Sequence, residues 1–169
     1  MLGRLVRGVH CQAANLGGHL TVNFQGHKCL CGNVGCAEAE AGGWALQRIV
    51  QETPGFDESS LASNSKLDFH AVFTAAKNGD AVARAVREHC LRVWAANTVA
   101  VIHAYDPEIV VFGGGVMRSA NDILPFVQEH VNEHAWTGWG TPRVCAATLG
   151  SNAALLGAVP LLSEDLRLL

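Results

Sequence analysis

The chain has 169 residues, a formal net charge of −3 and 16% charged residues. It therefore offers no general electrostatic attraction for nucleic acid or for an anionic membrane. Hydrophobic residues make up 49% of the sequence, which is typical of a globular domain and excludes a disordered chain. The length suffices for one domain with its own core. Because the first residues lack a signal peptide and no stretch is long and apolar enough to span a bilayer, we expect a cytoplasmic protein.

Two short strands are predicted at the start of the chain. Residues 5–9 and 20–24 alternate apolar and polar side chains and contain β-branched residues, a pattern that favours strands. The segment 13–18 between them is rich in small and turn-forming residues, so we expect a connecting turn.

A single helix is predicted from about Cys36 to Ile49. Pro54 ends it, because proline has no backbone donor and disfavours a helical residue before it. Gly42 and Gly43 lie inside this helix and disfavour it by about 1 kcal/mol each relative to alanine. Close packing is therefore expected at the glycine pair.

Two more helices follow, over residues 67–77 and 81–104. Asp80 is the predicted N-cap of the second one, since a carboxylate can accept hydrogen bonds from the first free backbone N–H groups. From residue 93 to 104 the pattern is apolar on nearly every face. We therefore expect this helix to run through the middle of the fold.

The last part of the chain predicts two buried parallel strands joined by a helix. Residues 108–112 and 143–148 are short apolar runs, which favour buried strands. An amphipathic helix over 121–134 separates them, and a C-terminal helix is predicted over about 153–162. This order indicates an α/β or α+β fold in which the two strands are joined by a crossover helix.

Three cysteines within the loop from Gly26 to Cys36 carry the most specific chemistry of the sequence. Cys29, Cys31 and Cys36 have a spacing suited to a tetrahedral zinc site, for which a histidine is the expected fourth ligand. His19 and His27 are both candidates for that ligand. The other three cysteines are scattered, so a metal site with spare thiols is favoured over a disulfide framework.

The stretch G-H-L-T-V-N-F-Q-G-H-K-C-L-C-G-N-V-G-C-A-E, residues 18–38, resembles the signature of the ROK proteins (repressor, open reading frame, kinase). That signature is Glu-x-Gly-His followed by Cys-x-Cys-Gly-x-x-Gly-Cys-x-Glu. The segments 106–117 and 149–158 are also similar to the family. The resemblance covers nearly all 169 residues, as a single domain similar to the C-terminal half of a ROK protein. It implies the C-terminal domain of the actin-like ATPase (ribonuclease H-like) fold, an α/β domain with a mixed sheet and flanking helices.

The resemblance also implies ligands. It makes His19 the fourth Zn²⁺ ligand beside Cys29, Cys31 and Cys36, and places His19 and Glu38 against the hydroxyls of a hexose or N-acetylhexosamine. The turn Gly113-Gly114-Gly115, which alone is an ordinary strand-to-helix turn, becomes a contact for ATP/Mg²⁺. The implied activity is the ATP-dependent phosphorylation of the sugar, as in a glucokinase.

The chain departs from the family pattern in two respects. The signature glutamate falls at position 16, which is Leu16; Asn15 is the neighbouring side chain able to bond a hydroxyl. The phosphate-binding Asp-x-Gly-x-Thr motif does not occur, and no aspartate has the context of a catalytic base. We therefore expect the chain to be inactive alone.

Two alternatives remain open: the sugar-sensing effector domain of a ROK transcriptional repressor, and a non-catalytic remnant. The coding sequence upstream of Met1 would distinguish them. An apolar face that a missing half would cover also predicts self-association as a homo-oligomer.

Overall fold

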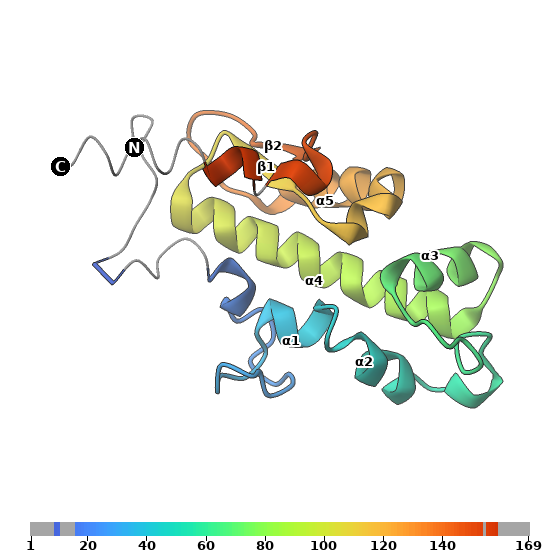
Figure 1. The fold of residues 1–169 in the computed structure, drawn as a ribbon. Helices are drawn as coiled ribbons and strands as arrows, with labels where there is room; N and C mark the ends of the chain where they lie inside the picture. Colours follow the sequence, from blue (N-terminus) through green and yellow to red (C-terminus); the bar gives the residue numbers. More distant parts are fainter. Residues whose placement is uncertain (1–8, 11–15, 154, 159–169) are drawn as a thin grey trace.

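The computed structural model describes residues 9–10, 16–153 and 155–158. The described part is mostly helical, with one small sheet (Figure 1). Its principal elements, in chain order, are α1 (Ala37–Ala41), α2 (Leu46–Glu52), α3 (Phe69–Lys77), α4 (Ala81–Tyr105), β1 (Ile109–Phe112), α5 (Ala120–His134) and β2 (Arg143–Ala146). Short 3₁₀ turns are η1 (Gly17–His19), η2 (Phe56–Glu58), η3 (Gly115–Ser119) and η4 (Gly150–Asn152).

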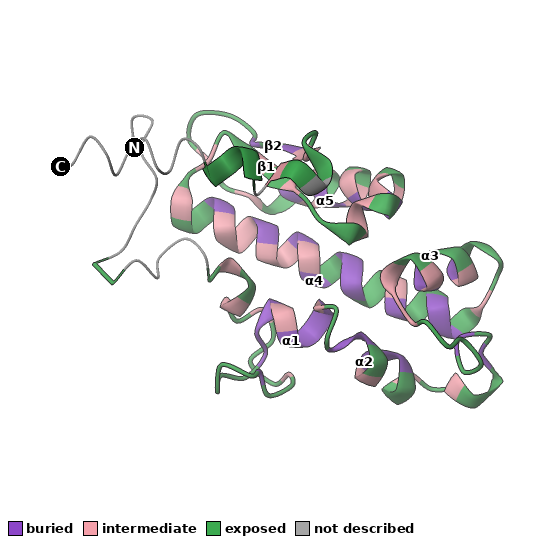
Figure 2. Ribbon diagram, viewed as in Figure 1, coloured by how far each residue is buried: buried purple, intermediate pink, exposed green. Residues whose placement is uncertain are grey.

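Helix α4 is the central element, as its apolar second half predicts. In Figure 1 it runs between α1 and α2 on one side and the sheet with α5 on the other. One buried cluster joins α1, α2 and α3 to its first half, and a second joins its second half to α5 and β2. Buried residues therefore recur along the whole helix (Figure 2). Among the described residues, no helix combines the length and the apolar character that crossing a bilayer requires.

The predicted N-cap of α4 is confirmed. The Asp80 carboxylate accepts the backbone N–H of Ala83 at 2.9 Å, which satisfies one of the free donors of the first turn. It also accepts the Ser59 hydroxyl at 2.9 Å and both the N–H and the hydroxyl of Ser60 at 2.8 Å. Asp80 therefore ties the loop that follows η2 to the start of the central helix.

These bonds predict a pH-dependent contribution to stability. Burial alone would raise the pKa of Asp80, but the Ala83 N–H and the Ser60 and Ser59 donors lower it to about 2. The contribution is complete above the unfolded pKa and is lost as the pH falls towards 2. We expect Asp80→Asn to lower the free energy of unfolding by about 2 kcal/mol at neutral pH, and by less at about pH 3. Urea denaturation at the two pH values checks this, and an equal loss at both would contradict it.

The single helix predicted from Cys36 to Ile49 is wrong, because the structure forms two. Helix α1 ends at Ala41, and Gly42 adopts an extended conformation with φ −82° and ψ 158°. A Cβ atom on Gly42 would overlap the carbonyl oxygen of Glu38, so the chain passes too close to α1 for a larger residue. The glycine pair is therefore a break rather than a tightly packed helical turn. Helix α2 then ends at Glu52, two residues before Pro54, as predicted.

The strand predicted over residues 20–24 is also wrong. This segment forms one isolated antiparallel bridge, between Thr21 and Cys36, and the N–H groups of Val22 and Asn23 both donate to the Gly35 carbonyl. The segment lies against the curled cysteine loop, which offers no straight neighbour for a ladder. The other N-terminal strand, residues 5–9, lies almost entirely outside the described residues.

Strands β1 and β2 are parallel, as predicted, with Ile109 opposite Arg143 and Phe112 opposite Ala146. They are joined through α5, which confirms the crossover. The prediction that residues 108–112 are buried is wrong for one face, because Ile109 is 43% and Val111 58% exposed. Among the described residues the sheet has these two strands and is parallel, so the mixed character implied by the resemblance is not seen there.

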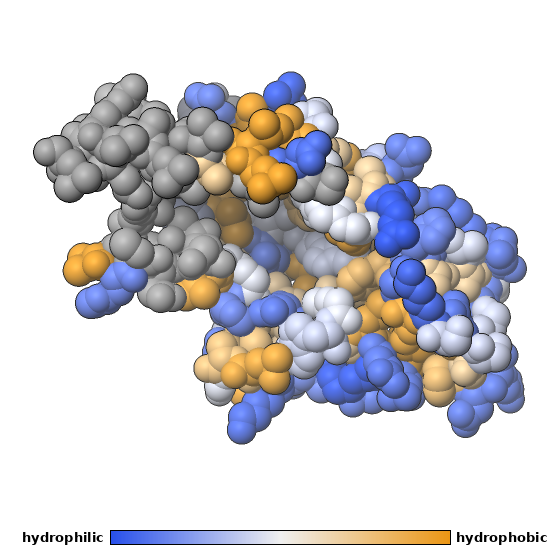
Figure 3. All heavy atoms as spheres, viewed as in Figure 1, coloured by the Kyte–Doolittle hydropathy of each residue, from blue (hydrophilic) through white to orange (hydrophobic). Residues whose placement is uncertain are grey.

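The C-terminal helix begins near Ala153, as predicted, and its described residues end at 158. It exposes Leu155 and Leu156 to 73% and 53%. Figure 3 shows apolar side chains gathered at this end of the molecule, over the sheet. This part of the surface is apolar and uncovered among the described residues.

Candidate functional site

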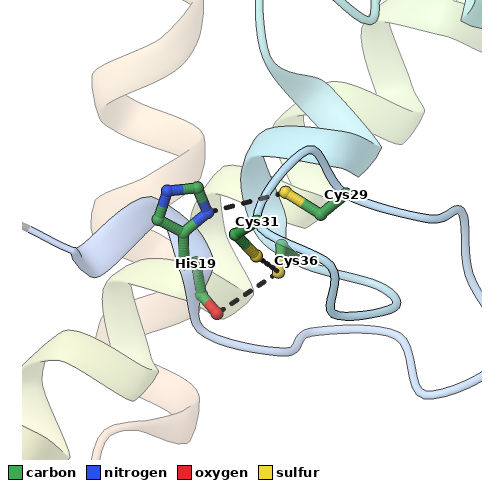
Figure 4. Close-up of side chains that lie close together, drawn as sticks. All are labelled: His19, Cys29, Cys31 and Cys36. Atoms are coloured by element: carbon green, nitrogen blue, oxygen red, sulfur yellow. Dashed lines mark hydrogen bonds between the residues drawn. The ribbon is translucent and has the colours of Figure 1, made fainter.

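The structure brings together His19, Cys29, Cys31 and Cys36, the four residues singled out by the sequence. Their Nδ1 or Nε2 and Sγ atoms all lie within 4.8 Å of one another. His19 Nδ1 is 3.5 Å from Cys29 Sγ, and Cys31 Sγ is 3.7 Å from Cys36 Sγ. Figure 4 shows the four side chains pointing toward one common centre. Histidine comes from η1 and the cysteines from the loop and the N-cap of α1.

These distances fit a tetrahedral zinc ion. With Zn–S bonds of about 2.3 Å and a Zn–N bond of about 2.1 Å, tetrahedral angles place two sulfur ligands about 3.8 Å apart and a sulfur and a nitrogen about 3.6 Å apart. His19 with Cys29, and Cys31 with Cys36, already have nearly these separations. A donor set of three thiolates and one imidazole is also typical of a closed structural zinc site. The type and grouping of the residues present therefore fit a zinc ion.

Two glycines make the return of the loop to the cluster possible. Gly32 and Gly35 adopt φ of +93° and +68°, which side-chain-bearing residues rarely adopt. A Cβ atom on Gly35 would in addition overlap the Asn23 carbonyl group. The bridge between Lys28 and Val34 closes the loop, so Cys29 and Cys36 are carried back to the same point.

The electrostatics of the cluster require a cation for all three thiols to ionise. Burial, and then the neighbouring Cys31 and Cys29 thiols, raise the pKa of Cys36 to about 12. The backbone N–H of Asn33 lowers the pKa of the exposed Cys31. Three adjacent thiolates repel one another unless a metal ion lies between them. The Asn33 side-chain amide also donates to Cys36 Sγ at 3.4 Å, as expected for a partner that orients a thiolate ligand.

His27, the other candidate for the fourth ligand, lies outside the cluster. Its Nδ1 is 3.3 Å from a Glu40 oxygen and its Nε2 is 3.0 Å from a Glu52 oxygen. Both ring nitrogens therefore face carboxylates rather than the thiols. Of the two histidines that spacing alone allowed, His19 is the one that the fold places at the cysteines.

Glu38 lies beside the cluster, on the side of His19. Its Oε2 is 3.3 Å from His19 Nδ1, and its side chain is 40% exposed. An open carboxylate next to an imidazole can accept hydrogen bonds from ligand hydroxyls. A cluster thiol therefore lies at the N-cap of α1, and a partly exposed carboxylate that faces His19 follows two residues later.

The two remaining predicted sugar contacts have different outcomes. Asn15 lies outside the described residues. Leu16 occupies the N-cap position of η1, where its carbonyl accepts the His19 N–H at 2.9 Å. Leu16 is 46% exposed, at the position where the family pattern has a glutamate.

The glycine turn predicted to contact nucleotide lies at the carboxyl end of β1. Gly113, Gly114 and Gly115 are exposed, and Gly114 has a φ of +86°. A Cβ atom on Gly113 would touch Ala147 of the segment after β2. Ligands of parallel sheets bind beyond the carboxyl ends of the strands, so the position suits a nucleotide. The contact itself remains a prediction.

Glu40 is a residue of the site that the sequence reasoning missed. It is 2% exposed, although glutamate is rarely buried without a partner. Its spacing of four residues after Cys36 places the two one helical turn apart. That spacing was readable in the sequence, but the burial of the carboxylate was not.

The comparisons with known proteins agree with the geometry. The sequence matches the family model described as "ROK family" over residues 1–165. A glucokinase of Thermotoga maritima is 33% identical over 168 residues, which cover 96% of this chain and 53% of that enzyme. The crystal structure of a ROK family glucokinase from Streptomyces griseus, in complex with glucose and AMPPNP, matches with a TM-score of 0.74 at 28% identity. That match covers 94% of this chain and 54% of the other.

Regulators are found at lower identity. A xylose repressor of Caldicellulosiruptor bescii is 23% identical over 168 residues, covering 96% of this chain and 42% of the repressor. The chain spans about half the length of the glucokinases that it matches. Both kinases and repressors are among its relatives.

Proposed function

The chain belongs to the ROK family, and we propose that it is the zinc-stabilised C-terminal half of an ATP-dependent kinase for glucose or an N-acetylhexosamine. One observation supports this most: the grouping of His19 with the three loop cysteines, with Glu38 open to solvent beside it. The identity to glucokinases, 32–33%, is higher than that to the repressors. The fold that we propose with it is the C-terminal domain of the actin-like ATPase fold.

In this proposal the residues of the chain bind and orient the two substrates. Zinc holds the loop and η1 together when bound, and supplies no chemistry to the sugar. His19 and Glu38 present a hydrogen-bonding pair to sugar hydroxyls, which fixes the orientation of the ring. The backbone of Gly113 to Gly115 provides a surface without side chains, against which ATP/Mg²⁺ can approach closely. The catalytic base and the phosphate loops belong to the half of a ROK kinase that this sequence does not contain.

The position of Leu16 predicts weak sugar binding that a single substitution should strengthen. Restoring the family's acceptor with Leu16→Glu should tighten glucose or N-acetylhexosamine binding by about 1–3 kcal/mol, which is about 5- to 150-fold. The side chain is half exposed, so the change should leave the fold intact. Titration calorimetry with glucose, N-acetylmannosamine and N-acetylglucosamine measures this.

Two controls make that experiment specific. Leu16→Gln supplies an acceptor without charge and should give a smaller gain, while Glu38→Gln in the Leu16→Glu background should remove most of it. If Leu16→Glu binds none of the three sugars more tightly than the unchanged chain, the proposed sugar site is wrong.

The effector domain of a ROK repressor is the second candidate, and Leu16 is the observation that favours it. The position departs from the signature that the kinases carry, and a regulator does not phosphorylate its sugar. An upstream helix-turn-helix in the coding sequence would support this candidate, and an upstream Asp-x-Gly-x-Thr segment would support the kinase.

The exposed apolar side chains at the sheet suggest how the chain associates. Val111, Leu155 and Leu156 are each more than half exposed, and a large contiguous apolar patch on a protein surface often marks an interaction site. In the absence of the other half we expect two copies to associate through this surface. Size-exclusion chromatography that shows a clean monomer would count against it.

A further inference from the structure

Glu40 presents a buried negative charge directly beneath the cysteine loop. It lies on α1, four residues after Cys36, and is 2% exposed. A buried carboxylate is costly unless hydrogen bonds replace its lost water. At this position the bonds come from the segment that leads into the cysteine loop, residues 23–27.

Three donors of that segment converge on the carboxylate. The His27 backbone N–H donates to Glu40 Oε1 at 2.6 Å, and His27 Nδ1 lies 3.3 Å from the same oxygen. The Asn23 side-chain amide donates to Oε2 at 3.3 Å. Both carboxylate oxygens therefore accept hydrogen bonds from this one segment. Among the described residues, the backbone of Asn23 is otherwise bonded outside the segment only to Gly35.

Gly26 shows how closely the segment wraps the carboxylate. A Cβ atom at this position would overlap the Glu40 carboxyl group and would also lie only 2.9 Å from the Asn23 side-chain nitrogen, which is bonded to that carboxylate. A glycine at 26 and a glutamate at 40 therefore fit each other sterically. The backbone of residues 23–27 is shaped around this one side chain, two residues before Cys29.

We propose that Glu40 is a positioning residue for the metal centre: it fixes the entry of the cysteine loop at Asn23 and His27, and so sets the position of Cys29. The inference rests on the zinc site proposed above. Helix α1 and its N-cap then have three functions, at every second residue from 36 to 40. The N-cap Cys36 provides a thiol, and Glu38 faces His19. Glu40 binds the segment 23–27, which leads into the cysteine loop.

The protonation state of Glu40 agrees with this role. Burial alone would raise the pKa of the carboxyl group, but the His27 N–H, the Asn23 amide and the His27 ring lower it below its ordinary value. The group is therefore charged at neutral pH, and its hydrogen bonds are of the stronger, charge-assisted kind. His27 is held on its far side by Glu52 at 3.0 Å.

Zinc release from the full chain tests the proposal. The rate at which a chromophoric chelator removes zinc is measured for the unchanged chain and for Glu40→Gln. The amide keeps the volume but turns a donor toward the Asn23 or His27 donors. We expect zinc release about 10- to 100-fold faster, as for loss of other partners that orient metal ligands. Asp80→Asn is the matched control, because it weakens the fold far from the loop and should leave the release rate unchanged.

A double-mutant cycle keeps the test decisive if Glu40→Gln folds poorly. Gly26→Ala alone should speed zinc release by about tenfold, because its methyl group displaces the carboxylate. In the Glu40→Ala background there is no carboxylate to displace, and the Asn23 side chain, no longer bonded to it, can move away from the methyl group. Gly26→Ala should then change the rate by less than about twofold. Additive effects of the two substitutions would overturn the proposal.

The possible results of these experiments distinguish an error in the role of Glu40 from an error in the zinc site. A chain that binds no zinc overturns both. If the unchanged chain binds zinc, but the Glu40→Gln variant releases it no faster than the Asp80→Asn variant does, the proposed role of Glu40 is wrong. The metal centre is not affected by that result. Faster release from Glu40→Gln, with the control unchanged, supports the proposal.

Discussion

Replacing Cys36 by serine should leave the chain without bound zinc and should unfold the segment from η1 to α1. Cys36 is fully buried and its sulfur lies at the centre of the contacts with Cys31, Asn33 and the His19 carbonyl. Apparent binding of zinc at such a site contributes on the order of 10 kcal/mol at neutral pH. This is as large as the whole stability of an ordinary domain. We therefore expect cooperative melting of the unchanged chain to be lost in the variant.

Circular dichroism during heating, with and without a strong chelator, measures this effect. Chelation of the unchanged chain should reproduce the behaviour of Cys36→Ser. Cys145→Ser is the matched control, since Cys145 lies in β2, outside the cluster. It should melt like the unchanged chain and keep its zinc. A Cys36→Ser protein with the stability of the control would show that the loop is held by its backbone bonds alone.

The second large expected effect is an absence of phosphoryl transfer by the chain alone. Transfer to a hydroxyl needs a base, a phosphate cradle and a metal-bound nucleotide. Four of the described aspartates are already engaged elsewhere. They cap α3 and α4, accept the Trp139 indole N–H, and pair with Lys77: Asp68, Asp80, Asp106 and Asp122. Asp57 lies in η2, for which neither the sequence nor the fold suggests a catalytic context.

A coupled assay of ADP release tests this prediction with ATP, Mg²⁺ and each of glucose, N-acetylmannosamine and N-acetylglucosamine. A full-length ROK glucokinase under the same conditions is the positive control. Since enzymes accelerate such reactions by at least about 10⁶-fold, loss of the base and cradle should leave no sugar-dependent signal. Robust turnover would mean that the base lies within these 169 residues and that the assignment of the missing half is wrong.

The helices could be predicted from the sequence where local bonds decide them. Asp68 and Asp80 cap α3 and α4 by contacts only three residues long, so the beginnings of these helices were predictable. The break at Gly42 depends instead on the approach of its backbone to Glu38. The exposed face of β1 was not predictable either. An apolar run indicates that a strand is buried, but it does not identify the residues that bury it.

The four residues of the cluster were predicted from the sequence, whereas the buried Glu40 beside them was not. The spacing of Cys29, Cys31 and Cys36 and the family resemblance together identified the cluster that the structure brings together. Spacing alone could not choose between His19 and His27, because both lie close to the loop in sequence. The difference arises from Glu40 and Glu52, which hold the ring of His27 away from the thiols. Burial of Glu40 is a tertiary property, and no sequence pattern revealed it.

The most direct test of the account is the metal content of the freshly purified chain, measured by native mass spectrometry beside elemental analysis. We expect one zinc ion bound per chain, retained through gel filtration and lost in Cys36→Ser. A chain that is folded and carries substoichiometric zinc would contradict this, because the loop, η1 and the neighbouring side chains of His19 and Glu38 would then be held without the metal.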